Sequence, residues 1–358
     1  MDDKDSAAWD REVLSARGTT ATIGDVIRSG YFRGELEPCW RRVLAFAKSR
    51  NGAAESRKVE LQASSEEFRT SRDLITAEET EQWLEERGLT LEDFTNFLLR
   101  NLQYDALTAI SNDPKMIDYA FAPAILRDIL RIDLLLSGEF DRLAIRFAWR
   151  LAASEGAKIP ANEDAISLER ECFQKRHGLN DAMLPAWLAG LGCDYLWLDK
   201  MLELEAIFRR EADALFTPGA RKRMLQSLRI ALTPVELELM EIDSCDAARE
   251  AFQCVVTDGE SMETIARNTN YPHHRFTVFC EELPEDVQQK ILFAMPGEVL
   301  EPIEHDSGFQ LYRLVKKGEL NLANEEVRQR VEAEIIRRHF SELAARFVHW
   351  ILPPNPRT

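Results

Sequence analysis

The stretch "GEVLEPIEHDSGFQLYRLV", residues 297–315, carries the pattern that decides the fold. It starts with a glycine that can form a turn, continues with a short extended run opened by Pro302, and then reaches an Asp-Ser-Gly turn. After that turn, polar and apolar residues alternate as they do in a β-strand. We therefore expect a β-hairpin that closes a sheet.

The residues before this hairpin supply the rest of a small domain. The run 233–244 alternates with period two after Pro234 and predicts a strand. Three helices, and one segment that is either a strand or an extended loop, are predicted to follow it, over 245–259, 261–270, 284–295 and 274–283. Residues 233–316 are therefore a predicted α+β domain in the order strand, helix, helix, helix, strand, strand.

The first two thirds of the chain has a helical pattern, and part of it occurs twice. The segment 66–94 is similar to the segment 170–198. Matching positions in the two segments are Trp83 and Trp187, Leu84 and Leu188, Gly88 and Gly192, and, if one residue is allowed to slip, Phe68 and Phe173, Leu74 and Leu179. We predict two related helical units, 21–112 and 124–230, after an acidic N-terminal arm, 1–20.

Local signals mark the helix boundaries in the first of these units. Thr76 precedes Glu79 by three residues, which predicts a capping box at the start of the Trp83 helix. Thr90 stands in the same relation to Asp93 and predicts a second, weaker one. Both tryptophans are expected to fill space between helices as core residues.

The C-terminal segment 322–352 predicts one long amphipathic helix. Its apolar residues fall on a broad stripe made of Val327, Val331, Ile335, Phe340, Leu343, Phe347 and Trp350. Asn324 is the expected N-cap. The stripe must be buried, either against the helical units or in a coiled-coil homodimer, and the sequence leaves both alternatives open.

Composition limits the function. A chain of 358 residues predicts two or three domains. The formal charge of −17 disfavours binding to nucleic acid or to an anionic membrane surface, whereas a basic or mixed peptide would be attracted. The acidic start lacks the pattern of a signal peptide, and no apolar run is long enough to span a bilayer, so a cytoplasmic protein is expected.

Cysteine and histidine patterns indicate neither a metal site nor a cofactor. The six cysteines are scattered without a CxxC pair, so free thiols are expected. His273 and His274 are adjacent, but no carboxylate or histidine partner stands at ligand spacing. We expect this pair in a surface loop.

Two parts of the chain resemble one family. "FRTSRDLITAEETEQWLEERGLTLEDF", residues 68–94, is similar to the helical N-terminal region of SurA-type and PpiC-type chaperone-isomerases. Residues 233–316, with the closing hairpin, resemble the parvulin-type peptidyl-prolyl isomerase domain of that family. The resemblance implies an α+β, predominantly helical protein with a duplicated SurA-like helical body. It also implies that the C-terminal helix folds back onto that body.

The resemblance assigns a prolyl pocket, and this chain departs from the family there. The family's two histidines are absent, because Gln310 stands at the last-strand position and the first strand offers only Glu238, Leu239 and Met240. The glycine-rich segment before the third helix is replaced by "NYPHHRFTVF". The expected peptide- or prolyl-binding residues are Leu239, Phe279, Leu283, Val287, Phe293 and Gln310, and none of them is given a catalytic role.

Three functions are consistent with this reading. The first is a chaperone-like protein that binds unfolded or extended polypeptide, with a degenerate isomerase domain, and that handles a ribosomally made precursor peptide. The second is an active peptidyl-prolyl isomerase, which must lower a rotation barrier of ~18–20 kcal/mol. The third is a non-catalytic partner subunit of a peptide-modifying enzyme.

Overall fold

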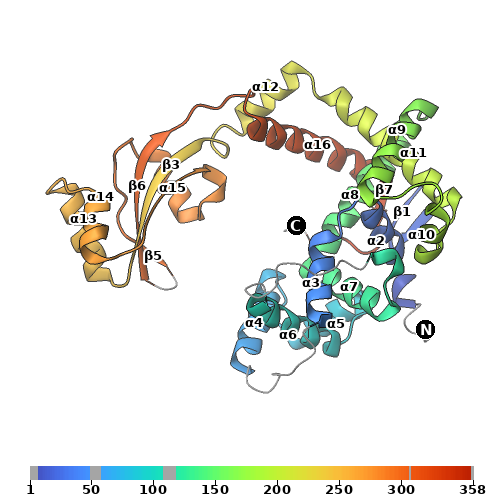
Figure 1. Cartoon of the computed structure of the whole chain (residues 1–358), viewed down its shortest axis with the longest axis horizontal. Coiled ribbons are helices and arrows are strands. Elements are labelled where there is room, and N and C mark those ends of the chain that lie inside the picture. Colours follow the sequence, from blue (N-terminus) through green and yellow to red (C-terminus); the bar gives the residue numbers. More distant parts are fainter. Residues whose placement is uncertain (1–6, 49–57, 108–117, 306–307, 356–358) are drawn as a thin grey trace. The chain divides into compact units, whose positions relative to one another are not determined.

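The computed structural model describes residues 7–48, 58–107, 118–305 and 308–355. The chain forms two compact units (Figure 1). Unit 1 comprises Met1–Asp213 and His339–Thr358, and unit 2 comprises Ala214–Arg338. Unit 2 is thus an insertion in the sequence of unit 1.

Unit 1 is built mainly from helices. In chain order they are α2 (Ile23–Phe32), α3 (Glu37–Lys48), α4 (Lys58–Ser71), α5 (Ala77–Glu86), α6 (Leu91–Leu107), the 3-10 turn η1 (Tyr119–Phe121), α7 (Ala124–Ser137), α8 (Glu139–Gly156), α9 (Glu163–His177), α10 (Leu184–Leu191) and α11 (Tyr195–Leu215). One buried apolar cluster contains side chains from both segments that were predicted to be separate helical units. The two segments therefore share one core instead of forming two.

A small antiparallel sheet completes unit 1, in the order β2-β1-β7. Its strands are β1 (Glu12–Ala16), β2 (Thr19–Thr22) and β7 (Val348–Trp350). Arg17 and Gly18 connect β1 to β2 with φ values of 46° and 77°, the left-handed conformation of a two-residue hairpin turn. The prediction of an N-terminal arm was wrong for residues 12–20, because the buried faces of β1 and β2 belong to the core.

The repeated sequence gives a repeated local structure. Phe68 lies edge-on to Trp83, with ring centroids 5.6 Å apart, and Phe173 lies in the same way against Trp187 at 5.2 Å. The helix that carries each tryptophan stops at a left-handed glycine, which has φ 65° at Gly88 and 67° at Gly192. The predicted capping boxes at Thr76 and Thr90 are confirmed by hydrogen bonds in both directions; these bonds join Thr76 to Glu79 and Thr90 to Asp93.

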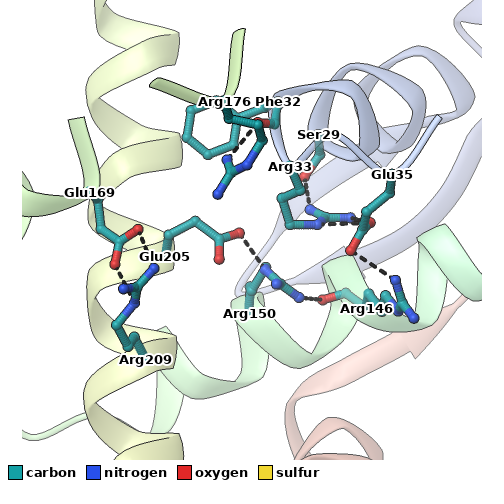
Figure 2. Close-up of polar contacts among 10 residues, drawn as sticks. All are labelled: Ser29, Phe32, Arg33, Glu35, Arg146, Arg150, Glu169, Arg176, Glu205 and Arg209. Atoms are coloured by element: carbon teal, nitrogen blue, oxygen red, sulfur yellow. Dashed lines mark hydrogen bonds and ion pairs between the residues drawn. The ribbon is translucent and has the colours of Figure 1, made fainter. Parts of the chain in front are cut away.

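Charged side chains cross the interior of unit 1 (Figure 2). Arg33 donates to Glu35 at 2.7 Å and to the Ser29 hydroxyl at 2.6 Å, and Arg146 reaches the same glutamate at 3.0 Å. Burial alone would raise the pKa of Glu35, but Arg33 and the neighbouring arginines hold that pKa below its usual value. Two further pairs join Arg150 to Glu205 and Arg209 to Glu169. These contacts tie α8, α9 and α11 together, because a buried charge needs a partner.

The long helix α16 (Glu325–Phe347) runs from unit 2 into unit 1. Its predicted cap is confirmed, since the Asn324 side chain accepts from the Glu326 N–H at 2.8 Å. The apolar stripe is divided between the units: Val327, Val331 and Ile335 are buried in unit 2, whereas Phe340 lies in unit 1, 4.6 Å from the Phe208 ring. The helix ends earlier than predicted, because residues 348–350 pair with β1 as a strand.

Unit 2 contains a four-stranded antiparallel sheet in the order β4-β3-β6-β5. Its elements are α12 (Pro218–Ser227), β3 (Pro234–Ile242), α13 (Cys245–Val256), α14 (Met262–Thr269), β4 (His273–Phe279), η2 (Cys280–Glu282), α15 (Glu285–Phe293), β5 (Ile303–His305) and β6 (Gly308–Lys317). Helices α13 and α14 cover one face of the sheet and α15 covers the other (Figure 1). The chain is therefore an α+β, mainly helical protein.

The structure changes one domain boundary of the prediction and settles one element that the prediction left open. Helix α12 was assigned to the second helical unit, which was predicted to end at residue 230, but it packs in unit 2 with Leu232, Phe279 and α16. The segment 274–283 was left open as a strand or a loop, and its first part belongs to the edge strand β4, which ends at Phe279. The hairpin residues 306–307 lie outside the described residues.

Candidate functional site

The sheet of unit 2 has two faces with different neighbours, because side chains alternate along each strand. On β3, Val235 and Leu237 belong to the cluster covered by α15, whereas Met240 and Ile242 belong to the cluster covered by α13 and α14. We call the first of these surfaces the α15 face. It is the surface onto which the resemblance maps a prolyl pocket.

The strand register places a row of side chains across the α15 face. Leu239 lies opposite His274 on β4 and opposite Tyr312 on β6. One step further along, Glu241 lies opposite Gln310, which in turn lies opposite Ile303 on β5. Residues directly opposite one another in an antiparallel pair share a face, so these two rows form one continuous surface.

A tyrosine and a glutamine make the polar centre of this surface. The Tyr312 hydroxyl donates a hydrogen bond to the Gln310 side-chain carbonyl oxygen at 2.9 Å. Burial, followed by the carboxylates of Asp286 and Glu241, raises the pKa of Tyr312 above its usual value. Both groups are therefore uncharged near neutral pH, and the pair can exchange hydrogen bonds with a ligand without changing its charge.

Four of the six predicted binding residues belong to this face. Leu239 and Gln310 are half-buried and accessible to a ligand. Leu283 and Val287 are 8% and 1% exposed, because they pack α15 onto the sheet. They are buried between α15 and the sheet and do not line an open pocket.

The other two predicted residues lie elsewhere, and their assignment to one pocket was wrong. Phe293 is 88% exposed at the end of α15, where the helix has turned its last apolar side chain to solvent. Phe279 is buried at the end of β4 in a different cluster, with Val327 and Val331. The guanidinium of Arg330 lies 4.4 Å from the centre of the Phe279 ring, which fixes that ring as part of the α16 packing.

A hollow of 340 Å³ adjoins the polar centre at the end of the sheet. Gln310 and Glu241 form part of its wall, together with Asp243, Tyr271 and His305. The Tyr271 hydroxyl donates to Asp243 at 3.0 Å, which fixes one side of the opening. The wall carries two carboxylates and the amide of Gln310, so it suits a ligand that offers hydrogen-bond donors.

The sequence reasoning missed His274, Tyr312 and Asp286 on this face. His274 was placed in a surface loop, but it lies in β4 on the same face as Phe276 and Val278. The period-two spacing of these three residues was the available signal. His274 is separated from Tyr312 by two strand spacings, roughly 10 Å. It therefore lies too far away to take the place of the absent first-strand histidine and to form a hydrogen bond with Gln310.

The small domain is strongly acidic. Residues 233–317 contain 17 Asp and Glu against 7 Lys and Arg, a formal charge of −10 of the chain's −17. A charge of this size attracts basic ligands and repels phosphate groups. Within the described ranges we find no cluster of three or more His, Cys, Asp or Glu placed to hold a metal ion. In the same ranges, every helix is too short or too polar to cross a bilayer.

Comparison with known proteins gives only distant similarities. Neither a family model nor a curated protein matches the chain. Among solved structures, it is similar to the peptidylprolyl isomerase PrsA from Bacillus cereus, with 13% identity and a TM-score of 0.38 over 60% of this chain and 84% of that one. It is also similar to PrsA from Bacillus anthracis (10% identity, TM-score 0.30, 57% and 94% covered). A third similar structure is reported with two SurA-like chaperones of Campylobacter jejuni (9% identity, TM-score 0.23, 60% and 88% covered).

Proposed function

We propose that this protein is a chaperone-like binder of extended, basic or mixed polypeptide and that its isomerase-like domain retains the binding surface without efficient catalysis. The observation that carries the proposal is the uncharged Tyr312–Gln310 pair on the α15 face, at the position where the resemblance expects a histidine. The half-buried Leu239 beside it offers an apolar contact. The formal charge of −10 on this domain supplies attraction at longer range.

Peptide binding and prolyl isomerisation require different things of the site. A polypeptide can be held by apolar contact, by a few hydrogen bonds and by charge attraction. Isomerisation must also stabilise a twisted amide, whose barrier is ~18–20 kcal/mol. A neutral glutamine held by a tyrosine can accept or donate a hydrogen bond, but it cannot change its protonation state as histidine can.

The first experiment separates binding from catalysis. Two basic peptides, identical except for one proline replaced by alanine, are titrated against the full chain, and a protease-coupled assay measures cis–trans turnover of the first. We expect similar affinities for both peptides, affinities that fall as salt rises, and no acceleration of isomerisation. Rapid turnover that Leu239→Glu abolishes would instead establish the alternative function, an active isomerase.

Matched variants locate the binding surface. Gln310→Ala removes the acceptor of the Tyr312 hydroxyl and is expected to weaken binding. Tyr312→Phe keeps the ring and removes only the donor hydroxyl, so it tests the same hydrogen bond from the other side. Gln310→His restores the family's residue and tests whether turnover can be regained. If neither Leu239→Glu nor Gln310→Ala changes peptide affinity, binding does not occur on the α15 face.

The finer proposal concerns the client. We propose a ribosomally made precursor peptide, with this protein acting beside the enzyme that modifies it, because the acidic domain suits a basic or mixed leader segment. The test measures the rate of a candidate modifying enzyme on its precursor with and without the chain. No change in rate and no binding to the precursor would exclude this role and leave a general chaperone. Cytoplasmic location and homodimer formation stay predictions.

A further inference from the structure

A second hollow, of 410 Å³, lies in unit 1 beneath the β1–β2 hairpin, and we call it the hairpin hollow. Its apolar wall comes from Leu151 on α8 and from Trp197 and Met201 on α11. The sheet side is formed in part by Ala16 and Ala21, whose small side chains leave the space empty. A space of this size, walled by an indole and a thioether, accepts a large apolar side chain.

The main chain beside the hairpin hollow is arranged to pair with another strand. In a two-residue hairpin the residues that flank the turn, Ala16 and Thr19, exchange hydrogen bonds, so the next pair, Ser15 and Thr20, does not. The N–H and C=O of Thr20 therefore point away from β1. Within the described part of the chain, β2 pairs with no other strand, and Thr20 is exposed where it borders the hollow.

The charged residues around the opening cancel one another. Arg17 forms an ion pair with Glu155 across the hairpin tip. The charged residues that line the hollow are two positive ones, Arg17 and Lys200, and two negative ones, Glu155 and Asp25. This opening is therefore neutral overall, unlike the acidic small domain. It suits an uncharged segment rather than a basic one.

We propose that unit 1 binds an extended, uncharged segment of another polypeptide. The segment pairs with the main chain of Thr20 and places one large apolar side chain in the hairpin hollow. A small apolar molecule would fill the hollow without using the hydrogen-bonding groups of Thr20, so a polypeptide matches more of what the site offers. The proposal adds a second site, with a different preference, to the acidic face described above.

The probe is a capped, uncharged heptapeptide of alternating Thr and Leu that carries a fluorophore, and its binding to the full chain is followed by anisotropy. Replacing the central Leu with Ala is expected to weaken binding by about tenfold or more. On the protein, Ser154→Leu fills the hollow from α8 and is expected to weaken binding by about tenfold, whereas Ser154→Ala leaves binding unchanged.

The main-chain contact has its own matched pair. Thr20→Pro removes the outward N–H and is expected to weaken binding by about tenfold, whereas Thr20→Val keeps the N–H and the β-branched shape and binds within about twofold of the parent. Circular dichroism confirms that each variant is folded. If Thr20→Pro unfolds the hairpin, the Ser154 pair still decides the outcome.

A photo-cross-linking version of the peptide, with benzoylphenylalanine at the central position, identifies the site directly. We expect cross-links to Leu151, Trp197 or Met201. Absence of binding, or cross-links confined to residues 233–317, overturns this inference while leaving the acidic-face proposal standing. Cross-links in the hollow, together with no binding of the basic peptide to the small domain, would support this inference and overturn the acidic-face proposal.

Discussion

Trp83 on α5 and Trp187 on α10 hold matching places in the repeated motif, yet their surroundings differ. Trp187 is fully buried, its indole N–H donates to the Tyr31 hydroxyl at 3.3 Å, and the Tyr31 ring stacks on it at 5.4 Å. Trp83 is half-buried, and the guanidinium of Arg87 lies 4.0 Å from its ring centre. The motif therefore fixes the local contact with phenylalanine and the glycine stop, whereas the depth of burial depends on helices outside the motif.

The largest expected effect comes from removing the deeper ring. Trp187→Ala should lower the free energy of unfolding of unit 1 by about 3–5 kcal/mol, because it leaves a cavity and removes the indole donor from the Tyr31 hydroxyl, which keeps only its hydrogen bond to Asp118. Chemical denaturation, followed by a probe placed in unit 1, measures the loss. Trp187→Phe is the control and should lose less, since it keeps most of the ring volume.

The matching change in the other copy should cost less. Trp83→Ala is expected to lower the same free energy by about 1–3 kcal/mol, because the ring is only partly removed from water and its cation contacts are partly solvated. The same denaturation experiment compares it with Trp187→Ala. Equal losses at the two positions would mean that the difference in burial has no energetic consequence.

The helix starts offer a smaller test of the comparison. Helix α5 begins with the Thr76–Glu79 capping box, whereas α10 has Met183 as its N-cap, receives no side-chain cap hydrogen bond from it and has a proline in its first turn. Thr76→Ala should destabilise unit 1 by about 1 kcal/mol. Met183→Ala should change stability little, and a loss equal to that of Thr76→Ala would contradict this account of the two helix starts.

The smallest expected effect is a change in pH dependence near Trp187. Burial lowers the pKa of His177, despite its contact with the Phe32 carbonyl oxygen at 3.0 Å. Because this pKa is depressed in the folded state, the stabilisation is present above the usual value of about 6.5 and is lost as pH falls below it. His177→Gln should therefore flatten the fall in unfolding free energy between pH 7.5 and pH 5.5. If the pH dependence of the unfolding free energy is unchanged in His177→Gln, His177 is not the source of that dependence.

Much of the small domain could be predicted because its signals are local. Period-two alternation in 233–244 and the turn after Pro302 specify strands without reference to the rest of the chain. The position of Gln310 on the α15 face follows from the same alternation. Phe293 was misplaced because an amphipathic helix fixes the spacing of its apolar residues but not which of them lies beyond the edge of the sheet it covers.

The errors concern elements whose partners are distant in sequence. Residues 12–16 form a strand that pairs locally with β2 and, through residues 14–16, with the distant residues 348–350. Neither β1 nor the segment 348–350 has enough alternation to predict a strand alone. The second segment was read as helix because Phe347 and Trp350 continue the spacing of the preceding apolar stripe. The sequence repeat could not predict that the two helical units share one core, because a repeat predicts local structure and not the packing between the copies.

The pairing of β1 with β7 has a consequence for synthesis. The central strand of this sheet leaves the ribosome early, but its second partner follows only after all 125 residues of the inserted unit 2 have been made. Residue 348 follows Ala16 by 332 positions, and at about 5–20 residues per second this interval is roughly 17–66 s. During that time the nascent β1 exposes an edge that later belongs to residues 348–350, so for a short period the chain itself is a substrate for the kind of protection that it is proposed to give others.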